Sequence, residues 1–130
     1  MKTEKKIINL TQHEISMFDM DDLVPGERRR GYYVRAGTEP VEIYPSQGVA
    51  RATCVEETVG RINGSDVVKR VYGGPQNLPE PKDGVYYIVT ALVANAARQA
   101  GRSVHDLLLT ARQVKDMQNN VVGYAAFGRL

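Results

Sequence analysis

The sequence has only one cysteine, Cys54, and two histidines among its 130 residues, and it has no long apolar run. A lone cysteine excludes an internal disulfide, and a cytosolic setting is the simplest interpretation. The start of the chain, MKTEKKIINL, is basic, but no apolar segment typical of a secretion signal or a membrane span follows it. We therefore expect a cytoplasmic protein with no membrane partner.

The chain also lacks a strong excess of charge of either sign. It has 17 lysines and arginines and 15 acidic residues, which gives a formal net charge of only +2. Binding to duplex nucleic acid needs a concentrated basic surface, so we expect no such partner. The run ERRR at 27–30 is interpreted as a solvated surface. The length fits a single domain, 1–130, and chains of this size often complete their burial by forming homo-oligomers.

Known catalytic constellations are missing as well. The sequence has no P-loop, no G-x-G-x-x-G after a strand and no G-x-S-x-G. His13 and His105 do not stand at metal-ligand spacing with each other or with Cys54, which we expect to be a small buried strand residue. Glu56 and Glu57 are neighbours in a strand pattern and would face opposite sides. We expect no catalytic residue, no metal and no cofactor.

The first half of the sequence is dominated by strand patterns. We expect strands at 5–10, 41–45 and 49–57, and a loop or insert at about 17–40 that is exposed at 19–31. Asn63-Gly64 stands between apolar residues and predicts a tight hairpin turn. The stretch 73–84 holds three prolines and three glycines and predicts an irregular connection.

The second half contains the one main helix that we expect, at about 90–100, after a strand at 85–90. Thr90 can cap the start of this helix and Gly101 can end it. The segment 103–116 is ambiguous and is interpreted as a turn, a strand and then a helical turn. Two strands are expected around a turn at Asn119-Asn120. The fold class is therefore α+β, with antiparallel strands and hairpins and one main helix packed on the sheet.

The expected helix has two different sides. An apolar side repeats at Leu92, Val93, Ala96, Ala97 and Ala100, and a polar side repeats at Asn95, Arg98, Gln99 and Arg102. A solvated face is the more common interpretation of a polar side. Solvated faces usually carry Glu and Lys, however, and no acid occurs between Val85 and Arg102. The polar side is therefore a candidate for binding.

Amide and guanidinium side chains together suit a ligand that has phosphates and base or ribose edges. The N–H groups at the helix start, beside Thr90, also attract anions. Tyr86 or the tyrosine next to it can face such a ligand, because successive strand residues point in opposite directions. Arg112 and Lys115 can hold phosphate and Asp116 can accept from a ribose hydroxyl, or the three form only a local ion pair.

Three longer motifs carry a family resemblance: INLTQHEI, VYGGPQNLPEPKDGVYYIVTALVANAA and LLLTARQVKD...VVGYAAF. With them the chain resembles a family of small proteins of tailed phages and prophages, and it is similar to the first type of Thoeris anti-defence sponge. The resemblance covers most of the chain apart from 17–40. It implies a non-enzymatic protein in the host cytoplasm that sequesters a cyclic ADP-ribose isomer made by a TIR-domain immune protein. Some members also hold cyclic oligonucleotides, and the family forms homo-oligomers with ligand pockets between protomers.

The resemblance also implies site residues. The family's aromatic falls on Tyr86 or Val85, and its helix asparagine falls on Asn95. Its basic and acidic positions fall on Arg112, Lys115 and Asp116, and a further phosphate contact falls near Arg61. The family usually has arginine where this chain has Lys115, which keeps the charge but loses the bidentate fork. The complete set of candidate ligand-binding residues is Tyr86, Thr90, Asn95, Arg98, Arg112, Lys115, Asp116 and Arg61.

Three functions remain open at this stage. The first is an anti-defence protein that binds and sequesters a cyclic nucleotide signal without degrading it. The second is a phage accessory module for protein interaction or assembly that binds a host protein. The third is a small enzyme that degrades a nucleotide signal.

Overall fold

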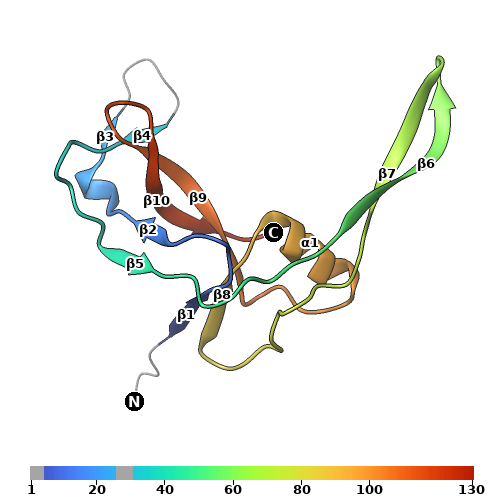
Figure 1. The fold of residues 1–130 in the computed structure, drawn as a ribbon, viewed down its shortest axis with the longest axis horizontal. Coiled ribbons are helices and arrows are strands. Elements are labelled where there is room, and N and C mark those ends of the chain that lie inside the picture. The colour runs from blue at the N-terminus through green and yellow to red at the C-terminus, as the bar shows by residue number, and fades with distance from the viewer. Residues whose placement is uncertain (1–4, 26–30) are drawn as a thin grey trace.

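The computed structural model describes residues 5–25 and 31–130 (Figure 1). Within these residues, eight strands form one sheet and two more form a separate hairpin. The main path of the sheet runs through β1 (Lys6–Asn9), β8 (Val85–Ile88), β9 (Leu107–Lys115), β10 (Val121–Gly128), β2 (Ile15–Met17) and β5 (Glu42–Tyr44). Helix α1 (Ala91–Gln99) connects β8 to β9 and packs on the sheet. The predicted α+β class is confirmed.

The directions of the strands are mixed. The pairs β1–β8, β8–β9 and β10–β2 are parallel, whereas β9–β10 and β2–β5 are antiparallel. The parallel pair β8–β9 requires a crossover, and α1 supplies it. The hairpin β9–β10 turns where it was expected, with Asn119 at a φ of 67°. Local patterns predicted this hairpin but not the parallel pairs, which join segments far apart in the sequence.

Asn9 helps to bring the two edges of the sheet together. It forms a parallel bridge with Ser46, just beyond β5, so the sheet is nearly closed. The side chain of Asn9 is fully buried, and its Nδ2 donates to the carbonyl oxygens of His13 (2.8 Å) and Tyr44 (2.9 Å). Its Oδ1 accepts from the N–H (2.9 Å) and the hydroxyl (2.6 Å) of Thr11. Both donors and both acceptor positions of the amide are therefore used.

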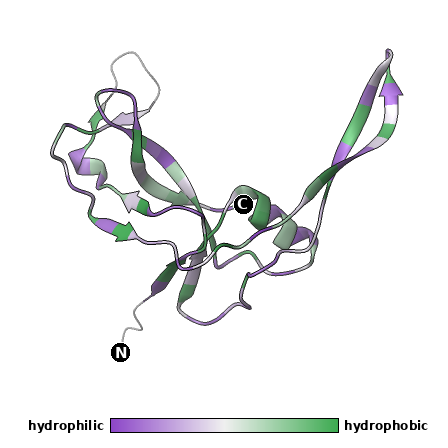
Figure 2. Ribbon diagram, in the orientation of Figure 1, coloured by the Kyte–Doolittle hydropathy of each residue, from purple (hydrophilic) through white to green (hydrophobic). Residues whose placement is uncertain are grey.

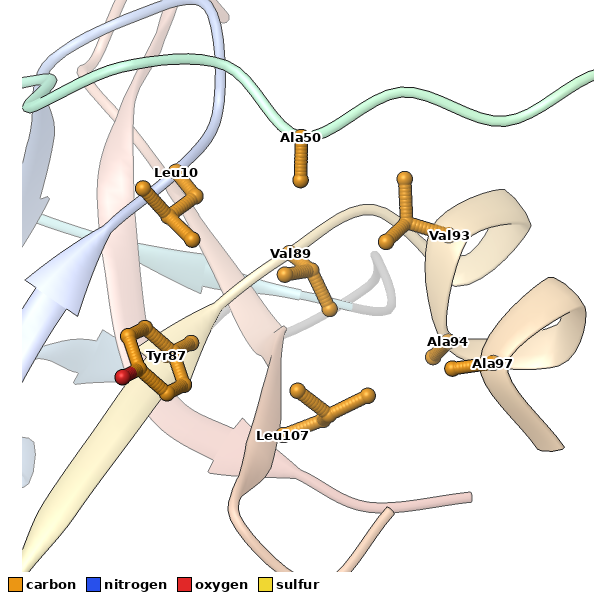
Figure 3. Close-up of a cluster of buried hydrophobic side chains, with 8 residues drawn as sticks. All are labelled: Leu10, Ala50, Tyr87, Val89, Val93, Ala94, Ala97 and Leu107. Carbon is orange, nitrogen blue, oxygen red and sulfur yellow. The ribbon is translucent and has the colours of Figure 1, made fainter. Parts of the chain in front are cut away.

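The helix is held on the sheet by a small apolar core (Figure 3). Val93 and Ala97 of α1 pack in one cluster with Tyr87, Val89 and Leu107 of the β8 and β9 region. The Thr90 hydroxyl caps the helix by accepting from the Val93 N–H at 3.3 Å, as predicted. Small residues on the helix allow this close approach, so a nine-residue helix is fixed to the sheet by few side chains.

The buried side of α1 differs from the expected one at both ends. Its buried residues are Val93, Ala94, Ala96 and Ala97. Leu92 is 38% exposed and Ala100 is also exposed, so these two expectations were wrong. Ala100 lies outside the core because the helix ends at Gln99, and Leu92 points along the surface between two hollows described below.

The separate hairpin consists of β6 (Cys54–Ile62) and β7 (Ser65–Tyr72) and extends away from the rest of the molecule (Figures 1 and 2). Its turn has Asn63 at a φ of 50° and Gly64 at 81°, as the Asn-Gly pair predicted. The strand expected at 49–57 begins only at Cys54, which is exposed and not buried as expected. The alternating pattern predicted burial wrongly, because no second layer formed by residues 5–25 or 31–130 covers this hairpin.

The segment 17–40 contains short regular elements. Met20–Asp22 forms a 3-10 helix, η1, and β3 (Val24–Pro25) pairs with β4 (Tyr32–Tyr33), which pairs with β9. The basic run at 27–30 lies outside the described residues. The helical turn expected at the end of the segment 103–116 is wrong, since β9 is a strand to Lys115. Pairing with β10 on one side and with β4 on the other keeps this region extended.

Candidate ligand-binding site

Two hollows lie on either side of Leu92 at the start of α1. The first hollow has a volume of about 420 Å³ and is lined by polar groups that include Thr11, Arg51, Thr53, Gln76 and Thr90. The second hollow has a volume of about 490 Å³ and lies between α1 and the foot of the hairpin. Its lining includes Glu56, Arg70, Tyr72 and Asn95. Leu92 lines both, so the hollows are neighbours.

Backbone pairing fixes the walls of the first hollow. Arg51 and Gln76 form an isolated antiparallel bridge with N···O distances of 3.0 and 2.7 Å. The N–H of Gly73 donates to the carbonyl of Thr53 at 2.9 Å. These bonds hold the 49–53 segment against the 73–84 connection, next to the start of the helix. The connection is irregular, as predicted, and it contributes Gln76 to the hollow.

The charge of the first hollow favours anions. Within the described ranges, the ion pairs are Arg61–Asp66 and Arg102–Asp106, so Arg51 and Arg70 have no ion-pair partner there. No acidic side chain lines the first hollow. The start of α1 adds the N–H groups of Ala91 and Leu92, which have no partner within the helix. The second hollow is closer to neutral because Glu56 lies across the hairpin from Arg70.

The polar side of α1 faces the foot of the hairpin. Asn95 lines the second hollow, and its Nδ2 donates to the Ala91 carbonyl at 2.9 Å. Its Oδ1 accepts from Arg98 Nη2 at 3.1 Å. Gln99 Oε1 accepts from the Tyr72 N–H at 3.4 Å. Of the predicted ligand-binding residues, Thr90 lines the first hollow, Asn95 lines the second, and Arg98 lies beside Asn95 through their hydrogen bond.

The other predicted residues lie elsewhere in this chain. Tyr86 of β8 has Lys5 Nζ 5.7 Å from its ring centre and lines a different hollow of about 260 Å³. Arg112 lies within β9 at a φ of 54°, and Lys115 ends that strand. Arg61 lies near the tip of the hairpin, where it contacts Gly64 O at 2.8 Å and Asp66 at 3.3 Å.

Asp116 organises the turn between β9 and β10. Its Oδ1 accepts from the N–H groups of Gln118 and Asn120, both at 2.9 Å, and its Oδ2 accepts from Asn120 Nδ2 at 3.2 Å. The backbone hydrogen bond from Asn120 is the main cause that lowers the pKa of Asp116 below its ordinary value. The carboxylate thus has a structural role within its own turn.

Sequence reasoning missed Arg51, Arg70 and Tyr72. A regular ladder counted from the Asn63-Gly64 turn would pair Tyr72 with Val55 and Arg70 with Glu57, and the bulge at Val59 shifts these partners to Cys54 and Glu56. The foot of the hairpin and α1 are far apart in the sequence, so no local sequence pattern predicts that they lie side by side. Arg51 was assigned to a regular strand, which hid its position beside Gln76.

Comparison with protein-family models, with curated proteins and with solved structures gave no match for this chain. In the described part of the chain, no group of three or more His, Cys, Asp or Glu side chains is placed to hold a metal ion. None of the helices described there is long and apolar enough to span a membrane.

Proposed function

We propose that this chain is a non-enzymatic binding protein that captures a cyclic nucleotide signal, such as a cyclic ADP-ribose isomer or a cyclic oligonucleotide. One observation carries the proposal: an aromatic ring, an amide and two arginines without ion-pair partners surround the start of α1. Arg51 and Arg70 would each take a phosphate, Tyr72 would stack on a base, and Asn95 would bind a base or ribose edge.

The proposed contacts supply a large part of the binding free energy that sequestration requires. Capture of a signal at sub-micromolar concentration needs a binding free energy of roughly −9 to −12 kcal/mol. Each hydrogen bond to a charged group contributes about 1.5–3 kcal/mol and a stacked base about 1–3 kcal/mol. Two arginines, one stacked ring and an amide therefore approach the requirement.

Calorimetry with cyclic ADP-ribose isomers and with cyclic di- and trinucleotides tests the proposal directly. We expect at least one of them to bind, and to be recovered chemically intact after the complex is denatured. Arg51→Ala and Asn95→Ala should each weaken binding at least tenfold, whereas Arg129→Ala, an exposed cation beyond β10, serves as the matched control. Absence of binding by the whole panel would refute the function, and conversion of the ligand would favour the degrading enzyme instead.

A second candidate function, a module for assembly, is favoured by a different observation. The hairpin exposes a series of large apolar residues, including Val55, Val59 and Ile62, each more than half exposed. Such a surface is typical of a protein interface. This function predicts an association that is independent of any nucleotide.

A further inference from the structure

The second strand of the hairpin, β7, presents one backbone edge to β6 and the other away from it. At the foot of the hairpin, the N–H of Gly73 donates across to the Thr53 carbonyl at 2.9 Å. The N–H of Tyr72 points away from β6 and donates to Gln99 Oε1 at 3.4 Å. Successive residues of a strand direct their N–H and C=O groups to opposite edges. The even-numbered residues of β7 therefore present these groups at the outer edge.

The outer edge of β7 is regular and exposed. Asp66, Val68 and Arg70 each present one N–H and one C=O there, and these groups have no hydrogen-bond partner among residues 5–25 and 31–130. The eight residues of β7 include neither proline nor glycine. The outer edge of β6, by contrast, is interrupted by a bulge at Val59 and Gly60. A bulge protects an edge from pairing, whereas a regular exposed edge is a template for an added strand.

The side chains beside this edge carry positive charge. β7 has two adjacent cations, Lys69 and Arg70, and neither forms an ion pair within the described ranges. The acids that lie directly across the hairpin from them, Glu57 and Glu56, belong to β6. The ion pair near the tip, at 3.3 Å, neutralises the other charges of the two strands. The free edge therefore belongs to the strand that has an excess of cations.

The chain itself shows which sequence pairs with β7. Residues 55–59 of β6 read VEETV. They place a valine opposite Val71, glutamates opposite Arg70 and Lys69, a threonine opposite Val68 and the bulge opposite Val67. Residues directly opposite each other in a ladder share one face, and opposite charges or β-branched pairs stabilise it. A strand with the same pattern on the outer edge would bring acids to both cations a second time.

We propose that the outer edge of β7 binds an extended, acidic segment of another protein by strand addition. The segment pairs antiparallel with β7, and its backbone groups bond to those of Asp66, Val68 and Arg70. Its two adjacent acids lie beside Lys69 and Arg70, and β-branched residues flank them. The acid beside Lys69 lies on the face of the hairpin opposite the second hollow. The contact does not depend on nucleotide binding.

A second β7 strand does not have this chemistry. In a pairing at the outer edge, Lys69 lies opposite a residue whose backbone groups also point away from the new contact. In a second β7 these are the odd-numbered residues, and none of them is acidic. A second copy has matching acids only on β6, where the bulge limits the regular edge to 54–58. The pattern therefore favours a different protein.

Amide hydrogen exchange with a synthetic peptide tests the proposal. The probe is acetyl-TSVEETV-amide, which repeats residues 53–59 with Cys54→Ser. Without peptide, we expect the amides of Val67 and Lys69 to be protected by β6 and those of Asp66, Val68 and Arg70 to exchange faster. Excess peptide should slow exchange at these three outward amides at least tenfold. Unchanged exchange at all three would overturn the proposal.

Reversal of charge tests the recognition. The peptide acetyl-TSVKKTV-amide should bind the wild-type chain at least tenfold more weakly than the acidic peptide. Lys69→Glu should weaken binding of the acidic peptide and strengthen binding of the basic one. Equal binding of both peptides by the wild type would overturn the charge complementarity, and this comparison needs no variant to fold.

A proline tests the backbone contact separately. Val68→Pro removes one outward N–H while leaving the ladder to β6 intact, so it should abolish peptide binding and preserve protection at Val67 and Lys69. Undiminished peptide binding by this variant would overturn strand addition. If the outward amides are protected without peptide and light scattering gives more than one chain, the edge binds a second copy and the proposal is wrong. These experiments contain no nucleotide, so failure of the proposed function would not affect their outcome.

Discussion

Arg102 and Asp106 form a buried, two-pronged ion pair: Nη1 lies 2.8 Å from Oδ1 and Nη2 lies 2.9 Å from Oδ2. The same guanidinium donates to the carbonyls of Ser103 at 2.6 Å and Pro79 at 2.7 Å. Arg102 was expected on the ligand-binding side of the helix. Its hydrogen bonds instead join the segment after α1 to the 73–84 connection. Arg102 therefore stabilises the connection that contributes Gln76 to the first hollow.

Removal of one partner of this pair should destabilise the fold strongly. Asp106→Ala leaves the charge of Arg102 largely buried, with side-chain exposure of only 12%, and should cost about 3–5 kcal/mol in the free energy of unfolding. Arg102→Met combined with Asp106→Leu should cost much less, because no charge is left unpaired. Urea denaturation measures both. Equal losses in the single and the double variant would show that the pair is solvated in solution.

The amide of Asn9 cannot be replaced by a carboxyl group. Asn9→Asp loses the two donors that bind the carbonyls of His13 and Tyr44, and it places a charge beside them. We expect a loss of roughly 3 kcal/mol or more at neutral pH, measured by thermal denaturation. Asn77→Asp makes the same exchange at an exposed amide with one long hydrogen bond of 3.4 Å, and should be nearly neutral. Similar melting temperatures for both variants would contradict the role assigned to Asn9.

Two glycines of β10 should respond differently to the same substitution. A Cβ at Gly123 would collide with the carbonyl oxygen of Ser16 and would come within 2.7 Å of the Phe18 ring. A Cβ at Gly128 would meet its nearest neighbour, Ala111, at an ordinary 3.7 Å. Gly123→Ala should therefore lower the stability by about 2–4 kcal/mol, whereas Gly128→Ala should change it by less than about 1 kcal/mol. Circular dichroism during heating distinguishes them, and a tolerant Gly123 would place β2 farther from β10.

The lowered pKa of Asp116 predicts that the stability of the fold decreases at acid pH. The pKa of Asp116 in the folded state is lowered below 3.8, so its carboxylate stabilises the β9–β10 turn above that pH. The stabilisation is lost as the pH falls through the folded pKa. Asp116→Asn should therefore melt at a slightly lower temperature than the wild type at pH 7, with the difference disappearing below the folded pKa. Titration followed by NMR should give Asp116 a pKa below 3.8, and an ordinary value would contradict the hydrogen bonds at this turn.

The sequence alone allowed the local elements of this fold to be predicted. The Asn63-Gly64 turn, the Thr90 cap and the Asn119 turn depend on the backbone angles or hydrogen bonds of nearby residues, and the structure contains all three. The parallel neighbours of β8 could not be predicted in this way, because their pairing depends on residues about 20 to 80 positions apart. Burial was misjudged at Cys54 for a related reason, since a strand pattern does not reveal whether a second layer covers it.

The candidate site shows the same division. Thr90 and Asn95 were found from the helix pattern, and the structure places both beside hollows. Arg70 and Tyr72 enter the site only because the hairpin returns its second strand to the helix. Arg51 escaped notice because its backbone pairs with Gln76, across a gap of 25 residues.

The bulge at Val59 determines which face of the hairpin each residue between Val59 and its turn occupies. Nine residues of β6 must match eight of β7, and the extra residue is absorbed between Thr58 and Gly60. If Val59 were paired with a residue of β7 in a regular ladder, every later residue of β6 would move to the opposite face of the hairpin. Arg61 would then lie on the face of Val55 and Val67, and Ile62 would lie on the face of Glu56 and Arg70. Deletion of Val59 would leave every other residue on its present face, because the shortened strand forms a regular ladder in which Arg61 still pairs with Asp66. The bulge, and not the extra residue itself, therefore keeps Arg61 off the face that carries Val55, Val59 and Ile62.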